Sequence, residues 1–511
     1  MALDLNSLPH QVDALQKIVR ELAQQLQQES AEKDKLRSLV RELLEAQRGR
    51  KSEQLSKEQL ALFEAAWKAE HPEDDPVEDE PDPESAGAEA GEPPARKPGG
   101  RKPLARNLVR ERIVHDLSEA EKHCKECGQD LRRIGEDISE RYEFIPATMK
   151  VLEDVRLRYA CDCTVRAADK PAQPIAKSTA GASLLAQVIV SKYCDHQPLH
   201  RQQQMFARHG VEISRQTMCG WTASVAGLVS PLYDSAKGLL FQSKVMGTDD
   251  TGVKVLDPKL NFARTGRLWP YVGDAQHPVV LFDYTPTRAR DGPAKFLEGY
   301  KGYLQADAYN VYDAFFTDAR GLVEVGCWMH ARRYFYKALE SDEQRMRPAL
   351  HLIARLYELE ERARGLSGGE RLALRQRASA RWMEKLRGYL DKISKELLPK
   401  SPGARAVRYA LRQWDALTRF LRDGDLEIDN GASERANRAV AVGRGNWTFF
   451  GSDQGGRTAA VLLSFVATCK RCGVEPFAWF RDVLSRIAMH PVYRIAELLP
   501  HNWKALAASQ A

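Results

Sequence analysis

The stretch KVMGTDDTGVKVL (residues 244–256) decides the fold, because a helical sequence gives way there to one of strands. RLWPYVGD (267–274) and PVVLFDYT (278–285) follow as apolar runs bounded by Asp, Gly and Pro, which predicts three antiparallel strands. Helices and strands then alternate along the segments PAKFLEG (293–299), GYLQADAY (302–309), NVYDAFF (310–316) and VEVGCWMH (323–330). The pattern predicts a mixed sheet with helices on its faces.

This order of elements matches the ribonuclease-H-like fold. In that fold acidic residues stand on the first strand, at the end of the fourth strand and on a helix after the fifth. Asp249, Asp307 and Glu434 occupy these places. Residues 335–425 are dense in Leu, Ala, Arg and Glu, which predicts a helical insertion. The predicted fold of residues 241–485 is therefore an α/β catalytic core of ribonuclease-H-like type with a helical insertion, followed by a C-terminal tail (486–511).

Three carboxylates that converge from separate elements suit a site for two Mg²⁺ or Mn²⁺ ions, because these ions prefer oxygen ligands and keep open positions for water and phosphate. Each carboxylate could instead have an ordinary structural role. DDTG is good turn chemistry, Asp307 could cap a helix, and Glu434 could pair with Arg438 one turn on. Successive strand residues face opposite sides, so only one of Asp249 and Asp250 should point into the site.

The N-terminal region has two distinct parts. Residues 1–70 carry a heptad pattern that predicts a self-associating coiled coil and hence a homo-oligomer; the alternative is one amphipathic helix packed on its own chain. Residues 71–112 are predicted to be a disordered acidic linker followed by a basic arm, which either contacts DNA or is simply solvated.

Two cysteine pairs lie in the predicted small domain 113–178. They are Cys124-x-x-Cys127 and Cys161-x-Cys163, with His123 as an alternative ligand. Two thiolate pairs on separate turns complete a tetrahedral zinc site, which would stabilise a segment too small for a good core. The sequence predicts a structural Zn²⁺ here; the alternative is buried cysteines without a metal.

A helix, a turn at Gly210 and a second helix capped by Ser214 follow within the predicted helical region 179–240. Arg215, Gln216 and Thr217 open the second helix, and these are base-reading residue types in helix-turn-helix proteins. Ordinary helical hairpins share the same pattern. We therefore predict a DNA-binding region, with an ordinary hairpin as the alternative.

The composition bounds the class of protein. Nine cysteines in 511 residues do not indicate a disulfide framework, and the net charge of +6 conceals an acidic linker, so the rest of the chain is more basic. No apolar run is long enough to span a membrane, and the first residues lack the features of a signal peptide. We expect a multidomain soluble protein of the cytoplasm with no membrane partner.

The sequence resembles transposases of the insertion sequence 66 family, bacterial enzymes with a DDE catalytic domain. The resemblance covers nearly the whole chain and rests on TDDTGVKVL, TGRLWPYV, YLQADAYNVYD, CWMHARRYF, IDNGASERANRAVAVGRGNWTFFGSDQGG (428–456) and ELLPHNW. It implies that Asp249, Asp307 and Glu434 form the metal-binding triad and selects Asp249 over Asp250. Family members commonly have glutamate at the latter position, and often a further cysteine where this chain has CDCT.

Further residues are candidates for supporting roles. Cys327-x-x-His330 resembles a signature that follows the second aspartate in many DDE transposases; the alternative is a satisfied histidine at a strand end. Cys469 and Cys472 are predicted to be core residues. Candidate DNA contacts near the triad are Arg435, Arg438, Arg444 and Trp447, although Arg435 and Arg438 could instead neutralise the acidic cluster and Trp447 could be a packing residue.

The resemblance implies a nucleoid-associated DNA transposase that binds element ends, cleaves to expose a 3′-hydroxyl and joins it to target DNA, with possible accessory proteins. Two other functions stay open. One is a catalytically silent DNA-binding regulator, and the other is a ribonuclease-H-like nuclease that cuts without joining.

Overall fold

The computed structural model describes residues 149–161, 164–167, 172–309, 311–316 and 321–503. The predicted coiled coil (1–70), the linker and arm (71–112), and Cys124, Cys127 and Cys163 lie outside the described residues. Residues 156–503 belong to one compact unit. The first described element of this unit is a short antiparallel hairpin of β1 (Arg158–Cys161) and β2 (Thr164–Ala167).

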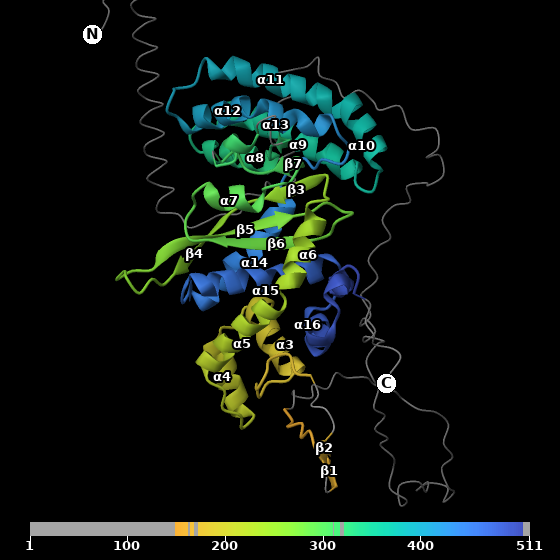
Figure 1. Ribbon diagram of the computed structural model, residues 1–511. Helices are drawn as coiled ribbons and strands as arrows, with labels where there is room; N and C mark the ends of the chain where they lie inside the picture. The colour runs from red at the N-terminus through yellow and green to blue at the C-terminus, as the bar shows by residue number, and fades with distance from the viewer. Residues whose placement is uncertain (1–148, 162–163, 168–171, 310, 317–320, 504–511) are drawn as a thin grey trace, which may run out of the picture. The chain divides into compact units, whose positions relative to one another are not determined.

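A mixed sheet forms the centre of this unit, as the sequence predicts (Figure 1). Its antiparallel part contains β3 (Val245–Thr248), β4 (Thr251–Val255), β5 (Arg264–Val272) and β6 (Val280–Thr285). Parallel strands extend it on both sides: β7 (Gly302–Gln305) and β8 (Leu322–Val325) beyond β3, and β9 (Phe449–Phe450) beside β4.

The predicted first strand is broken at Asp249 and Asp250. β3 and β4 pair with the same edge of β5 in one continuous register, from Gly247 opposite Val272 to Val255 opposite Arg264. In this register Asp249 stands opposite Pro270. Phe282 is the β6 partner of Pro270, but its amide donates to Ser464 and its carbonyl accepts from Tyr233. The backbones of Phe282 and Pro270 therefore do not bond to each other, and Pro270 turns its nitrogen to the other side, toward Asp249. Because proline has no amide hydrogen, the ladder loses a donor at this point.

Two sequence predictions differ from the observed elements after β6. The helix α7 (Asp291–Phe296) is present, but the helix expected near residues 310–316 is only a 3₁₀ turn, Asp313–Phe315. The strand expected to reach His330 ends at Val325, and α8 (Trp328–Ala338) begins after Cys327. The helix that carries Glu434 is α14 (Gly431–Trp447), and it continues through Gly443 and Gly445.

Helices account for the predicted insertion at residues 335–425. They are α9 (Glu343–Arg362), α10 (Gly368–Leu374), a π-helical turn (Arg375–Ser379), α11 (Ala380–Ser394), α12 (Pro402–Arg412), α13 (Trp414–Thr418) and a 3₁₀ turn (Arg419–Leu421). The helices α9, α11, α12 and α13 and the 3₁₀ turn share an apolar core with α8 and Val325. Arg375 is buried against Glu360, with 2.6 Å between Nη2 and Oε2. The insertion is thus anchored at the β8 side of the sheet.

The helices before the sheet are packed into the core of the sheet itself. They are α3 (Ala182–Tyr193), α4 (Leu199–Arg208), α5 (Arg215–Leu228) and α6 (Ser230–Leu240). The C-terminal helices α15 (Asp453–Arg471) and α16 (Pro476–Arg486) join the same core, with 3₁₀ turns at Ile487–Met489 and Val492–Leu498 after them. Figure 1 shows α15 between the sheet and helices α3 and α5.

Candidate metal centre

Asp249 and Asp307 lie at the ends of neighbouring parallel strands. β3 and β7 pair in parallel with Gly247 opposite Gln305, so the same register places Asp249 opposite Asp307, each two residues further on. Because parallel strands end at the same edge of a sheet, both carboxylates stand at that edge. The break at Asp249 therefore coincides with the edge of the sheet where both aspartates follow the ends of their strands.

Gly247 lets helix α14 approach the sheet closely. A Cβ atom at this position would lie 2.6 Å from Ser433 Oγ and 2.7 Å from Asn430 Oδ1. The side chain of Asn430 fixes the contact, because its Nδ2 donates to the Thr248 carbonyl at 2.6 Å. Glu434 is in the first turn of this helix, so the contact delivers its carboxylate to the end of β3.

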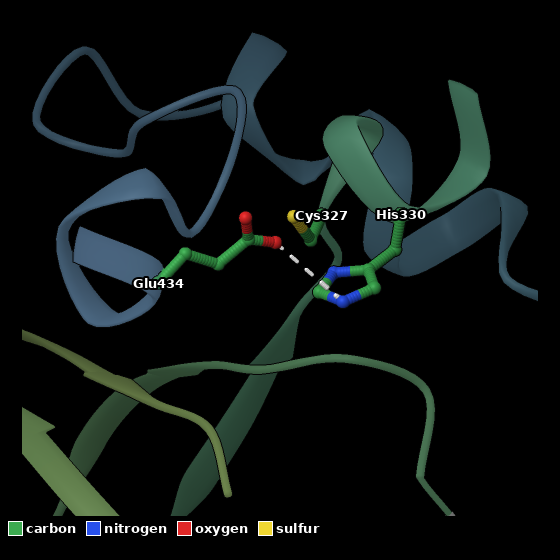
Figure 2. A group of neighbouring side chains, drawn as sticks. All are labelled: Cys327, His330 and Glu434. Carbon is green, nitrogen blue, oxygen red and sulfur yellow. Dashed lines mark ion pairs between the residues drawn. The ribbon is translucent and has the colours of Figure 1, made fainter. Parts of the chain in front are cut away.

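Glu434 faces residues of helix α8. Its Oε1 is 3.6 Å from His330 Nε2 and its Oε2 is 3.8 Å from Arg333 Nη2. Figure 2 shows Glu434, His330 and Cys327 turned toward one another from different elements. The sequence prediction that Cys327 and His330 accompany the site thus has a geometric basis, and Arg333 joins them although the sequence analysis did not single it out.

Burial raises the pKa of all three carboxyl groups, and the charges of neighbouring carboxylates add to this effect. Burial is the main cause for each. The neighbouring charges of Asp249 and Asp250 further raise the pKa of Asp307, which reaches about 6. Asp249 also raises the pKa of Glu434, while His330 and Arg333 act to lower it. For Asp249 itself, the donors Asn437 and the Asp250 amide oppose the effect of burial on the pKa. Carboxylates that disfavour one another's charge form a site where a cation is stabilising.

A divalent cation fits this donor set. Oxygen ligands from three elements suit Mg²⁺ or Mn²⁺. Glu434 Oε1 is buried and has no hydrogen-bond partner among the described residues. A buried acceptor without a donor is costly, and a metal ion would satisfy it.

Asp250 is turned away from this centre. Its side chain is 3% exposed and paired with Arg267 Nη1 at 2.9 Å and Arg288 Nη2 at 2.6 Å. Arg288 also stacks on the Tyr309 ring, with 3.6 Å between the guanidinium carbon and the ring centroid. The alternation expected of strand residues holds, since Gly247 and Asp249 face α14 whereas Asp250 binds arginines.

Asn437 is part of the site and was missed in the sequence analysis. Its Nδ2 donates to Asp249 Oδ2 at 2.8 Å, and the residue is only 8% exposed. It orients the carboxylate of Asp249. The available signal was its spacing, because a residue three positions after Glu434 lies on the same face of a helix.

The candidate DNA contacts on α14 fall into two groups. Arg435 and Arg438 are exposed. Arg444 instead donates to the Gly252 carbonyl at 2.8 Å, and Trp447 stacks on Phe450 with 4.7 Å between ring centroids. The latter two therefore have structural partners, and Arg435 and Arg438 remain the better candidates for contacts to phosphate.

Two helices joined by a short turn, α4 and α5, are present where the sequence predicts them. Gly210 adopts a positive φ in the turn, and Ser214 caps α5 by accepting from the Thr217 amide at 3.0 Å. Arg215, Gln216 and Thr217 are all exposed in the first turn of α5. Their exposure is compatible with base reading by a recognition helix, and the DNA-binding role of these residues stays a prediction.

We expect the double substitution Arg215→Ala and Gln216→Ala to weaken binding to a specific DNA end. One good bidentate contact to a base contributes about 1–3 kcal/mol, so the loss should be on the order of 10- to 100-fold and greater for specific than for random DNA. Fluorescence anisotropy with both DNAs at fixed salt measures it. Arg364→Ala on the exposed surface of the insertion is the control, and an equal loss on both DNAs would contradict base reading.

We expect Asp307→Asn to stabilise the protein in the absence of divalent ions. The folded pKa of about 6 exceeds the ordinary aspartate pKa of 3.8, so the folded wild type binds more protons between these values and loses stability as the pH rises through that window. Above pH 6 the variant should gain on the order of 2 kcal/mol in free energy of unfolding, and the gain should shrink toward pH 4. Urea unfolding in EDTA at several pH values checks this.

The matched control for that measurement is Asp391→Asn, whose carboxylate is half exposed on α11. It should change the free energy of unfolding little at any pH. A gain for Asp307→Asn that is equal at pH 4 and pH 7.5 would contradict the electrostatic explanation.

The remaining cysteine predictions have mixed outcomes. Cys469 is fully buried on α15 in the main core, as expected, and Cys472 at the end of that helix is only partly buried. Only the backbone of Cys161, the last residue of β1, is described. The zinc-ligand prediction for Cys124, Cys127, Cys161 and Cys163 therefore stays a prediction.

Comparison with protein families identifies the class of protein as a transposase. The model described as "Transposase IS66 family" matches residues 177–458, which contain all three carboxylates. Three further models match: the IS66 C-terminal element at 464–501, the zinc-finger binding domain of transposase IS66 at 121–164, and the "Transposase C of IS166 homeodomain" at 35–113. The chain belongs to the IS66 family of transposases.

Relatives from Sinorhizobium fredii (strain NBRC 101917 / NGR234) support this membership. The uncharacterized protein y4hP is 34% identical over 79% of this chain and 77% of its own length. The uncharacterized protein y4jD is 33% identical over 76% of this chain and 79% of its own.

No helix within the described ranges is both long and apolar enough to cross a bilayer.

Proposed function

We propose that this chain binds the ends of a DNA element, cleaves there to expose a 3′-hydroxyl and joins that end to target DNA, with Asp249, Asp307 and Glu434 as the metal ligands. The observation that carries the proposal is the position of these three residues in the fold, two just after the ends of adjacent parallel strands and one on a helix packed against the sheet. Family membership supports the same activity.

We also propose that the core is of ribonuclease-H-like type. The supporting features are the antiparallel strands β3 to β6, the parallel strands β7 and β8 beyond β3, and the late helix α14 across the sheet. The positions of the three carboxylates follow the pattern of that fold. The helical insertion lies between β8 and α14.

The chemistry is an in-line displacement at phosphorus in both steps. In cleavage, a water oxygen forms a bond to phosphorus while the bond to the 3′-oxygen breaks, and that oxygen takes up a proton. In joining, the freed 3′-hydroxyl attacks a target phosphodiester, loses its proton and displaces the target 3′-oxygen. Two Mg²⁺ or Mn²⁺ ions held by the triad would supply Lewis acidity at the attacking and leaving oxygens.

The chain's other residues prepare the triad for this work. Asn437 holds the Asp249 carboxylate in one orientation, and the Asn430 contact to Thr248 holds the first turn of α14 against β3. Arg267 and Arg288 neutralise Asp250, so that its charge does not compete with the triad for a cation. Arg435 and Arg438 are exposed on the same helix as Glu434 and are placed to contact DNA phosphates.

The N-terminal parts complete the proposal. The matches at residues 35–113 and 121–164 support a helical segment and a zinc-binding segment that serve DNA binding and assembly. We propose homo-oligomerisation through the coiled coil, and action on DNA in the bacterial cytoplasm at the nucleoid.

The test is cleavage and strand transfer of labelled element-end DNA with Mg²⁺. Joined products of a precleaved end with a free 3′-hydroxyl are the expected result. Cleavage without joined products would favour a nuclease, and end binding without either product would favour a DNA-binding regulator. Either outcome would overturn the proposal.

A further inference from the structure

Three potential ligands of different chemistry meet beside the carboxylate site. One ligand atom each from Cys327, His330 and Glu434 lies within 4.8 Å of the others (Figure 2). Only Glu434 belongs to the proposed triad. Cys327 and His330 lie beside the third carboxylate, and the proposed two-metal reaction assigns no role to them.

The end of β8 and the start of α8 position these two residues. Cys327 is the extended N-cap residue of α8, and His330 follows in the first turn. The Asn430 amide donates to Cys327 Sγ at 3.2 Å, and the His330 amide also points at it. Amide donors stabilise the negative charge of a thiolate, and hydrogen bonds to sulfur recur in metal–thiolate centres.

Two atoms of the cluster are buried without a hydrogen-bond partner among the described residues. They are Glu434 Oε1 and His330 Nδ1. The 3.6 Å between Glu434 Oε1 and His330 Nε2 is beyond hydrogen-bond range, yet it is close to the separation of two ligands on one ion. Glu434 Oε1 and His330 Nε2 therefore make no hydrogen bond to each other, whereas a metal ion between them would bond to both.

We propose that Cys327, His330 and Glu434 bind a zinc-class transition-metal ion at a site separate from the proposed Mg²⁺ positions but sharing Glu434. Thiolate and imidazole ligands select Zn²⁺ and its relatives over Mg²⁺, which takes oxygen ligands. Burial keeps the thiol protonated in the metal-free protein, since it raises the pKa of Cys327 to about 12. The bound ion takes the place of that proton, which is released to solvent.

Such an ion would withdraw Glu434 from the Mg²⁺ ligands and so inhibit the enzyme. This consequence rests on the proposed function, whereas the binding itself does not. A chain that carries the ion would hold DNA ends without cutting them.

Metal counting on the full chain tests the binding. Wild type, Cys327→Ser and His330→Gln are equilibrated with Zn²⁺, separated from free ion by gel filtration and analysed by mass spectrometry of the metal. We expect one zinc fewer per chain in each variant than in the wild type. Because the wild type and the variants all contain the N-terminal segment, any zinc bound there adds equally to each count and does not affect the difference. Cys219→Ser, at an exposed free cysteine, is the control and should keep the wild-type count.

Cobalt spectra give a second readout that does not depend on the count. A thiolate-to-cobalt charge-transfer band should be present in the difference between wild type and Cys327→Ser, and absent between wild type and Cys219→Ser. Circular dichroism confirms that the variants are folded. Equal zinc counts in folded wild type, Cys327→Ser and His330→Gln, with no difference band, would overturn the proposal.

Inhibition is measured separately, as strand transfer in Mg²⁺ with rising Zn²⁺. Because losing an outer-shell partner already costs roughly 10- to 100-fold in metal affinity, loss of the Cys327 ligand should raise the inhibitory Zn²⁺ concentration by at least tenfold. An unchanged inhibitory concentration would refute the regulatory consequence. Absence of any strand transfer in Mg²⁺ alone would count against the proposed function. The proposed zinc site would then be tested by the zinc count.

Discussion

Glu434→Gln is expected to lower strand transfer by at least about a thousandfold while leaving end binding intact. Glutamine keeps the size of the side chain and removes the charge that holds a cation. Lewis-acid stabilisation of the transition state amounts to several kcal/mol, and about 4 kcal/mol corresponds to a thousandfold change in rate. Single-turnover joining of labelled, precleaved ends measures the effect.

The control for this substitution is Glu427→Gln. Glu427 lies just before α14, and its side chain is 64% exposed and paired with Arg371. It should join ends at the wild-type rate. The metal-binding role of Glu434 would be abandoned if Glu434→Gln joined ends as fast as this control.

Gly247→Ala is expected to have the second-largest effect, through the position of helix α14. The new Cβ would lie 2.6 Å from Ser433 Oγ and 2.7 Å from Asn430 Oδ1, which is far below van der Waals contact. Overpacking of this kind costs about 1–3 kcal/mol, and a shift of about 1 Å at a catalytic group can lower the rate by about 100-fold. Thermal unfolding and strand transfer together report both effects.

Gly445→Ala is the matched control, because it lies on the same helix and its added Cβ meets open space. It should be neutral or slightly stabilising, since alanine favours a helix more than glycine does. Ser433→Ala removes one of the two clashing atoms and should partly restore Gly247→Ala. Wild-type stability and activity in Gly247→Ala would show that the helix does not depend on this close approach.

The sequence predicted the strands of the sheet well because apolar alternation is a local property of the chain. Apolar runs bounded by Gly, Pro and Asp marked β3 to β8, and the same runs placed Asp249 on the first strand and Asp307 at the end of the fourth. The structure differs from the prediction at two places. The first strand is broken opposite Pro270, and residues 313–315 form a 3₁₀ turn instead of a helix, because the geometry of the sheet prevails there over local propensity.

Long-range contacts were outside the reach of local patterns. Asn437 meets Asp249 across 188 positions of sequence, and Arg288 meets Asp250 across 38. The α14 helix continues through Gly443 and Gly445, although glycine disfavours helices, because Trp447 and Phe450 stack and Arg444 binds the Gly252 carbonyl. Tertiary packing overrode local propensity at this point.

The sequence by itself determined the mixed sheet and the helical insertion, because alternating apolar patterns are local properties of the chain, whereas the metal-binding role of the three carboxylates stays a prediction. Only the tertiary structure showed that arginines bind Asp250, that Asn437 orients Asp249, and that Cys327 and His330 lie beside Glu434. These depend on the parallel register of β3 and β7 and on the close packing of α14 at Gly247, which join segments far apart in the chain.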